Sequence, residues 1–280
     1  IADWEAIGAI VSEIPEAAKR LADAFWPGPL TMILNKSDLV PYATTGGLET
    51  VAVRMPVNPI ARALIRAGGG YVAAPSANTS GRPSPTKAEH VAEDLNGKID
   101  MIIDGGTVDI GLESTIVDLT DGAPTILRPG YINQEMLTKV LGEVEMDRGL
   151  IAPESGVHPK APGMKYRHYA PKADLIIVEG EAEKVRRKIN ELVQQQISEG
   201  KKVGVIGTDE SLSYYKDGDV RSIGSRKDEI TIAQHLFGLL REFDESDISV
   251  IYSEAFETPQ IGQAIMNRLI KAAGHQIIRV

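Results

Sequence analysis

The chain has 280 residues, which is long enough for one large domain or two of ordinary size. Its 39 acidic residues outnumber its 30 basic ones, and the net charge of −9 argues against stable, nonspecific binding of nucleic acid, which needs a basic face. There is no cysteine, so disulfides and thiolate metal sites are excluded, and no apolar run approaches the roughly 20 residues of a membrane span. Nothing suggests secretion, and we expect a cytoplasmic protein.

The first half of the chain mixes helix and strand patterns without regular alternation. Helical spacing predicts two helices between Trp4 and Trp26, the second beginning at Pro15, and the prolines of "WPGPL" end it. This order predicts an α/β domain with a mixed twisted sheet over residues 1–146. Its other elements are expected as strands over 31–35, 50–56, 71–78, 100–106, 113–120 and 124–130, and helices over 58–70, 87–95 and 133–142.

The second half divides into a linker and a smaller domain. Residues 147–173 are rich in proline and glycine and lack periodicity, which predicts a linker or lid. From residue 174 to residue 280 strands and helices alternate, which predicts a small, parallel, Rossmann-like α/β domain. Its elements are expected as strands over 174–180, 201–207 and 247–254, and helices over 181–198, 231–243 and 261–274.

The loop "AAPSANTSGRPSPTKAEHV" (73–91) collects small polar groups after an expected strand. The hydroxyls of Ser76 and Ser84 can donate to phosphate oxygens, and the amide of Asn78 can donate and accept. The alternative is an ordinary capped turn, because serine, asparagine, glycine and proline are the usual turn residues.

Two arginines stand in otherwise apolar strands, Arg54 in "VAVRMP" and Arg128 in "LRPG". A buried guanidinium needs a partner, which is either a protein carboxylate or an anionic ligand. Ser114 and Thr115 begin a strand, and they either reflect β-propensity or bind a small polar ligand.

Several chemistries lack their motifs. There is no Walker loop, no G-x-G-x-x-G and no G-x-S-x-G, and His168 has no second ligand at a metal-binding spacing. We therefore expect no metal site built by the protein, and an enzyme that acts by positioning and charge stabilisation.

Taken in order, "FWPGPLT", "TVAVRMP", "APSANTSGRPSPT", "IIDGG", "ESTIVD" and "ILRPG" resemble the YrdC-like domain of threonylcarbamoyl-AMP synthases. "APGMKYRHYAP" resembles the linker of the long two-domain members, and "IGQAIMNRLIKAA" the end of their C-terminal domain. The resemblance implies an enzyme that joins L-threonine, bicarbonate and ATP, with Mg²⁺, into threonylcarbamoyl-adenylate and pyrophosphate. The product would go to the machinery that modifies an adenosine of tRNA.

The resemblance also implies roles for particular residues. Arg54, Ser114 and Arg128 would be catalytic, with Arg54, Ala74 and Ser114 holding threonine. Tyr166 and Tyr169 would fold over the site and exclude water. The residues expected to bind ATP are Thr50, Ser76, Asn78, Ser84, Arg128, Tyr166 and Tyr169.

The sequence departs from the family at its start. Members carry an N-terminal "TVYG"-like strand and a Lys-x-Arg pair for ATP, and "IADW" corresponds to a point several tens of residues into that pattern.

Two other functions are alternatives to the synthesis of threonylcarbamoyl-adenylate. An RNA-binding YrdC-like module without catalysis would bind tRNA with a steep salt dependence. A carbamoyl-transfer enzyme of hydrogenase maturation would need zinc-finger cysteines, which the chain lacks.

Overall fold

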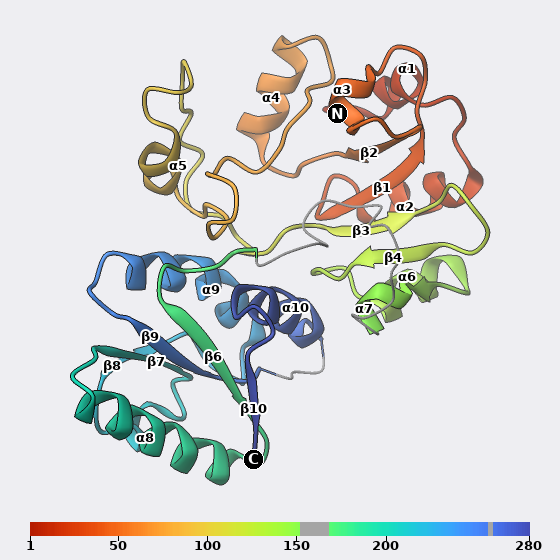
Figure 1. Cartoon of the computed structure of the whole chain (residues 1–280). Coiled ribbons are helices and arrows are strands. Elements are labelled where there is room, and N and C mark those ends of the chain that lie inside the picture. Colours follow the sequence, from red (N-terminus) through yellow and green to blue (C-terminus); the bar gives the residue numbers. More distant parts are fainter. Residues whose placement is uncertain (152–167, 257–259) are drawn as a thin grey trace. The chain divides into compact units, whose positions relative to one another are not determined.

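The computed structural model describes residues 1–151, 168–256 and 260–280, and Figure 1 shows their secondary structure. The chain divides into two compact units. The first unit takes the described residues of Ile1–Pro75 and Glu113–Pro162, and the second takes those of Ser76–Leu112 and Gly163–Val280. The second unit therefore includes a segment, 76–112, that interrupts the first unit in the sequence.

The longer helices of the first unit begin and end close to where the sequence predicts. After η1 (Trp4–Ala6) and α1 (Ile7–Ile10), α2 (Glu16–Phe25) starts behind Pro15 and stops before the prolines of "WPGPL". The side chain of Asn133 caps the last long helix, α6 (Gln134–Leu141), by accepting the N–H of Met136 at 2.9 Å. The remaining helices of this unit are α3 (Tyr42–Thr45), α4 (Pro59–Ala67) and α7 (Arg148–Ile151), and the sequence did not predict α3 or α7.

The strands of the first unit are β1 (Leu30–Asn35), β2 (Thr50–Arg54), β3 (Thr115–Asp118), β4 (Thr125–Arg128) and β5 (Glu145–Met146). They form a sheet in the order β2-β1-β3-β4-β5, in which β1–β2 and β3–β4 are antiparallel and β1–β3 and β4–β5 are parallel. The predicted mixed sheet is confirmed. Leu30, Met32 and Leu34 pack into a core with α1, α2 and α6, so the alternate residue Thr31 faces the other side of the sheet.

The prediction of strands over 71–78 and 100–106 is wrong. Neither stretch forms a strand, although both are rich in apolar residues. A strand exists only when another strand pairs with its backbone, and the pattern of side chains alone cannot supply that partner. Their large apolar side chains are accordingly exposed, as at Val72 (49%), Met101 (74%) and Ile103 (49%).

The strands of the second unit are β6 (Asp174–Glu179), β7 (Val203–Gly207), β8 (Asp219–Ser222), β9 (Val250–Glu254) and β10 (Ile277–Arg279). Their order is β10-β6-β9-β7-β8, and every neighbouring pair is parallel, which confirms the predicted Rossmann-like sheet. The short strands β8 and β10 were not predicted. The helices of this unit are α5 (Ala88–Leu95), α8 (Ala182–Ser198), η2 (Leu212–Tyr214), α9 (Glu229–Asp244) and α10 (Gly262–Ala272).

Alternation along the strands gives the second sheet a core on each face. Leu175 and Ile177 of β6 pack with α9 and α10, whereas Val178 packs with α8. Among the described helices, none is both long and apolar enough to cross a membrane.

Candidate functional site

A row of side chains crosses the first sheet on the face opposite its helical core. Thr31 of β1 is paired with Arg54 of β2 on one side and with Ile116 of β3 on the other. Ile116 is in turn paired with Arg128 of β4. Because directly paired residues point to the same face, the register brings Arg54, Thr31 and Arg128 onto one face of the sheet.

Ser114, the residue immediately before β3, joins Thr31 to Arg128 in this row. Its hydroxyl lies 2.7 Å from the hydroxyl of Thr31, and both residues are buried. Arg128 donates from Nε to the carbonyl oxygen of Ser114 at 3.0 Å and from Nη2 to the Ser114 hydroxyl at 3.3 Å. The structure therefore brings together three predicted residues, Arg54, Ser114 and Arg128. It adds Thr31, for which a threonine in an apolar strand gives no sequence signal.

A close backbone approach holds the start of β3 in place. At Gly130, a Cβ atom would lie 2.5 Å from the backbone nitrogen of Thr115. The hydroxyl of Thr115 donates to the carbonyl oxygen of Ile132 at 2.7 Å, so this threonine has a structural role. Glycine in "LRPG" thus allows the turn after β4 to fix Ser114 next to Arg128.

Arg54 is the candidate anion-binding group of this row. Its Nε donates to the carbonyl oxygen of Gly28 at 3.1 Å. More than a third of the residue is exposed, yet the surrounding protein still desolvates the guanidinium and lowers its pKa. Over the described ranges, no carboxylate lies within ion-pair distance of Arg54. Within these ranges the charge of Arg54 is therefore not neutralised by an ion pair.

Two other predicted residues belong to the first unit but are not members of this row. Thr50 is at the opposite end of β2, four residues from Arg54, which corresponds to about 13 Å along a strand. Ala74 lies in an exposed stretch without regular structure.

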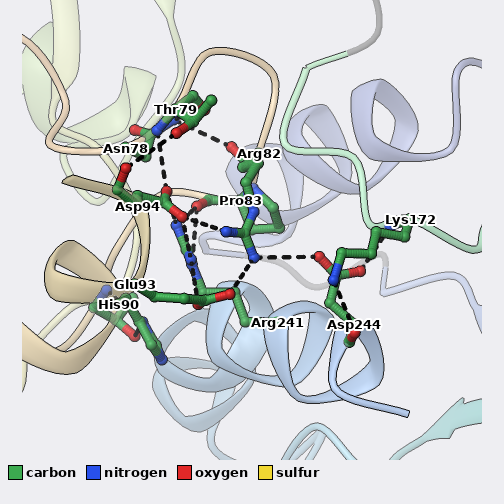
Figure 2. A network of polar contacts seen from close by, with 11 residues as sticks. Asn78, Thr79, Arg82, Pro83, His90, Glu93, Asp94, Lys172, Arg241 and Asp244 are labelled. Atoms are coloured by element: carbon green, nitrogen blue, oxygen red, sulfur yellow. Dashed lines mark hydrogen bonds and ion pairs between the residues drawn. The ribbon is translucent and has the colours of Figure 1, made fainter. Parts of the chain in front are cut away.

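In the second unit, Ser76, Asn78 and Ser84 belong to one loop. Ser76 is exposed and Ser84 is buried, with 8% of its surface accessible. Asn78 donates from Nδ2 to the carbonyl oxygens of Thr79 at 2.9 Å and Arg82 at 3.4 Å (Figure 2). These two acceptors fix the orientation of the amide, and its buried Oδ1 finds no donor among the described residues. Oδ1 can therefore accept a hydrogen bond from a ligand.

The structure describes one of the two tyrosines that are predicted to cover the site. Tyr166 lies outside the described residues. Tyr169 has a positive φ of 64° and is only 3% exposed. Its ring packs against His168, with ring centres 4.2 Å apart, and against Phe237 at 5.0 Å. In this structure Tyr169 thus belongs to the core of the second unit.

The structure also bears on metal binding. Within the described part of the chain, no group of three histidine, cysteine or acidic side chains is arranged to hold a metal ion. His90 accepts the N–H of Thr86 on Nδ1 at 3.1 Å. Burial and the charges of Arg241 and Lys87 lower the pKa of His90.

A cavity of about 560 Å³ opens at the carboxyl ends of β6, β7 and β9. Ligands often bind at this edge of a parallel sheet. However, its carboxylates already have protein partners: Glu254 accepts from Tyr215 at 2.6 Å and from Arg226 at 2.5 Å. Glu210 accepts from the hydroxyl of Ser225 at 2.5 Å, and hydrogen bonds outweigh its burial to lower its pKa to about 2. We assign no ligand to this cavity.

Comparisons with known proteins identify the family. A family model described as telomere recombination matches residues 1–130, and a model of the C-terminal domain of threonylcarbamoyl-AMP synthase matches residues 132–274. A threonylcarbamoyl-AMP synthase of Pyrococcus abyssi is 52% identical over all 280 residues, which cover 80% of that relative. One of Bacillus subtilis is 47% identical over the same length, covering 79% of it.

Solved structures agree with these relatives. The chain matches a crystal structure of P. abyssi Sua5 complexed with L-threonine with a TM-score of 0.93 and 50% identity, over 100% of this chain and 80% of the other. A structure of a double-alanine variant of the same protein also matches with a TM-score of 0.93, at 49% identity, over 100% of this chain and 79% of the other. With two family models that together span nearly the whole chain and relatives this similar, the chain belongs to the threonylcarbamoyl-AMP synthase family, whose members are nucleotidyltransferase-type enzymes.

Proposed function

We propose that this chain condenses L-threonine, bicarbonate and ATP into threonylcarbamoyl-AMP and pyrophosphate. The observation that carries the proposal is the guanidinium of Arg54, which stands opposite Thr31 without a carboxylate partner among the described residues. The carboxylate of a free amino acid supplies such a partner. The name of the P. abyssi relative, and the L-threonine in the crystal structure of P. abyssi Sua5, support threonine as that amino acid.

Threonine is assigned to Arg54, Ala74 and Ser114. The guanidinium of Arg54 pairs with the threonine carboxylate, and the hydroxyl of Ser114 contributes a hydrogen bond. Ser114 is suited to this role because Thr31 and Arg128 already fix its position. A buried hydroxyl that does not have to reorganise loses little entropy when a ligand binds.

ATP is assigned to Thr50, Ser76, Asn78, Ser84 and Arg128. The serine hydroxyls donate to phosphate oxygens, and the Oδ1 of Asn78 accepts a hydrogen bond that the described protein does not supply. Tyr166 and Tyr169 are assigned to the cover of the site.

The reaction proceeds in two steps. The amine of threonine and bicarbonate form a carbamate with loss of water. A carbamate oxygen then bonds to the α-phosphorus of ATP, the bond from that phosphorus to the bridging oxygen of the β-phosphate breaks, and pyrophosphate leaves with the electron pair. Arg128 stabilises the negative charge that builds on the phosphoryl oxygens. Mg²⁺ enters with ATP as part of the substrate, held mainly by the phosphates, as is usual for this ion.

The proposal also covers the fate of the product, the compartment in which the reaction takes place and the boundaries of the domains. The product passes to the machinery that transfers threonylcarbamoyl groups to tRNA, and the reaction takes place in the cytoplasm. We assign the catalytic domain to residues 1–146, the linker to 147–173 and the C-terminal α/β domain to 174–280.

Pyrophosphate release tests the proposed reaction. The protein is incubated with ATP and Mg²⁺, and threonine and bicarbonate are added together or one at a time. We expect release only when both are present, and serine in place of threonine serves as a control for specificity. Release that ignores threonine would refute the proposal, as would a lack of release with all substrates.

A further inference from the structure

The second unit contains a buried ionic network whose charged groups have no part in the proposed reaction (Figure 2). Its centre is Arg241 of α9, whose side chain is 2% exposed, although its helix neighbours Leu240 and Phe243 belong to the apolar core. Burying a guanidinium is unfavourable unless its hydrogen-bonding groups are answered. The groups that answer Arg241 therefore indicate what the residue does.

All five N–H groups of Arg241 have an acceptor. Nε and Nη2 both donate to the carbonyl oxygen of Pro83, at 3.1 and 2.6 Å. Nη2 also donates to Asp94 Oδ2 at 2.8 Å, and Nη1 to Asp94 Oδ1 at 3.3 Å and to Glu93 Oε2 at 3.2 Å. A guanidinium has five donors in a rigid fork, so this arrangement uses its full capacity.

The acceptors of Arg241 belong to the loop proposed to bind ATP and to the helix that follows it. Asp94, on α5, has no exposed side-chain surface and also accepts the backbone N–H of Thr79 at 3.0 Å. Arg82 contacts Asp94 and donates to Glu93 at 2.7 Å. The loop is thus held at Thr79, Arg82 and Pro83, between Asn78 and Ser84.

The charges of the network favour its ionised form. Burial opposes ionisation of Asp94, but the hydrogen bonds from Arg241 and Thr79 and the charges of Arg241 and Arg82 outweigh it and lower the pKa of this carboxyl. Asp244, which ends α9, lies 3.6 Å from Arg82 and accepts the N–H of Lys172 at 2.6 Å. Through Asp244, the network therefore joins the loop to the C-terminal end of α9 and to Lys172.

We propose that Arg241 is a positioning residue for nucleotide binding: through Pro83 and Asp94 it holds the loop of residues 76–84 in the conformation that presents Asn78 and Ser84 to ATP. This inference rests on the proposed function of that loop. It gives the C-terminal domain a defined part in the reaction, although that domain contributes no group to the reacting atoms in this assignment.

Arg241→Lys tests the proposal, because lysine keeps the charge but cannot reproduce the fork that reaches Pro83 and both oxygens of Asp94. We expect the dissociation constant for ATP, measured calorimetrically, to rise about tenfold or more, as for loss of one charge-assisted hydrogen bond. Binding of threonine should change less than twofold. Amide hydrogen exchange in residues 79–84 should become faster. Asp94→Asn, which removes the charge from the other side of the network, should act in the same direction.

The matched control is Arg226→Lys, which alters another arginine of the second unit that pairs with a buried glutamate, Glu254. It should leave ATP binding unchanged. All measurements are made at a temperature where circular dichroism shows each variant to be folded. A purely structural Arg241 would lower thermal stability without changing affinity for ATP, and that result would overturn the proposal.

Two further variants separate this inference from the proposed function of the loop. If Asn78→Ala and Ser84→Ala weaken ATP binding but Arg241→Lys does not, the positioning role is wrong and the loop's function stands. If Arg241→Lys accelerates exchange in the loop and none of the variants changes ATP binding, the loop does not bind ATP and both proposals fall.

Discussion

Arg54 and Arg241 both stand in largely apolar elements, but their guanidinium groups differ in how many hydrogen-bond acceptors the protein supplies. Arg241 is buried with an acceptor for each of its five donors. Arg54 donates from Nε to Gly28, and its two Nη groups find no acceptor among the residues described. The first arrangement is complete without a ligand and serves the conformation of the protein. The second is not completed by the described part of the protein.

At the residue scale, Arg54→Ala should weaken threonine binding. Removing a charge-assisted pair with the substrate carboxylate is expected to raise KM for threonine about tenfold or more. KM for ATP should change little. The control is Arg66→Ala, since Arg66 pairs with Asp3 at the surface of the same unit, 2.6 Å away and outside the candidate site. An unchanged KM for threonine in Arg54→Ala would remove this residue from the site.

The ion pairs and hydrogen bonds of Asp94 predict how the free energy of unfolding changes as the pH falls. The pKa of Asp94 is lower in the folded protein than the ordinary value of about 3.9, so its stabilising contribution is present above about pH 4 and is lost as pH falls through the folded pKa. Asp94→Asn should lower the free energy of unfolding near neutral pH by about 3–5 kcal/mol, as when one partner of a buried pair is removed.

Urea unfolding between pH 2 and pH 7 measures this effect. The stability of the wild type should fall more steeply with acid than that of Asp94→Asn, so that the two curves converge at low pH. Parallel curves would show that Asp94 is not held in its charged form.

At the residue scale, sequence reasoning identifies groups more easily than it identifies their neighbours. Arg54 and Arg128 attract attention because a charge interrupts an apolar strand. Thr31 gives no such signal, and only the strand register places it opposite Arg54. Arg241 stands in an amphipathic pattern, and its partner Asp94 lies 147 residues away in the sequence. A local sequence pattern cannot reveal a contact between two residues that are so far apart in the chain.

At the scale of elements, the end of the segment 76–112 passes close to α9. Gly111 has a φ of +79°, and a Cβ atom there would lie 2.4 Å from the carbonyl oxygen of Ala233 and from the Cα of Gln234. Both are backbone atoms of a helix and cannot move aside cheaply. This glycine allows the segment to pack against the helix that carries Arg241.

Gly111→Ala should therefore destabilise the second unit more than Gly97→Ala does. Gly97 has a similar φ of +75° but open space around its Cβ position, so alanine there costs only the left-handed conformation, about 1–2 kcal/mol. The difference in the free energy of unfolding between the two variants isolates the close approach. Equal losses would contradict the packing of residue 111 on α9.

Elements were predictable from sequence where their own pattern determines them. Helices α2, α4 and α6 follow from periodicity and their flanking proline, asparagine and glycine. The buried strands β1, β6 and β9 follow from their apolar runs. The strands expected over 71–78 and 100–106 do not form because pairing is a property of two segments. The strands β5, β8 and β10 are two to four residues long, too short for an alternating or apolar pattern to be recognised.

At the scale of the whole molecule, each unit has its own apolar core. The core on the α9 side of the second unit contains Phe237 and Tyr169, and that of the first unit contains Leu21 and Leu137. The residues of segment 76–112 belong with the second unit, although their neighbours on both sides in the sequence belong with the first.

Phe237→Ala should show this division. Truncating a buried phenylalanine is expected to destabilise its core by about 3–5 kcal/mol. In native-state hydrogen exchange followed by mass spectrometry, peptides from the second unit, including 76–112, should lose protection together. Peptides from 1–75 and 113–146 should not. If segment 76–112 kept its protection with the first unit, the division would be wrong.

The measurement that tests the central claim most directly is the mass of the product. The protein is incubated with ATP, L-threonine and ¹³C-bicarbonate, and the mixture is analysed at once by liquid chromatography and mass spectrometry. We expect a compound with the mass of threonylcarbamoyl-AMP that is one mass unit heavier than with ordinary bicarbonate, and it should be absent when threonine is omitted. AMP and pyrophosphate without that adduct, or an adduct that carries no ¹³C, would contradict the assignment.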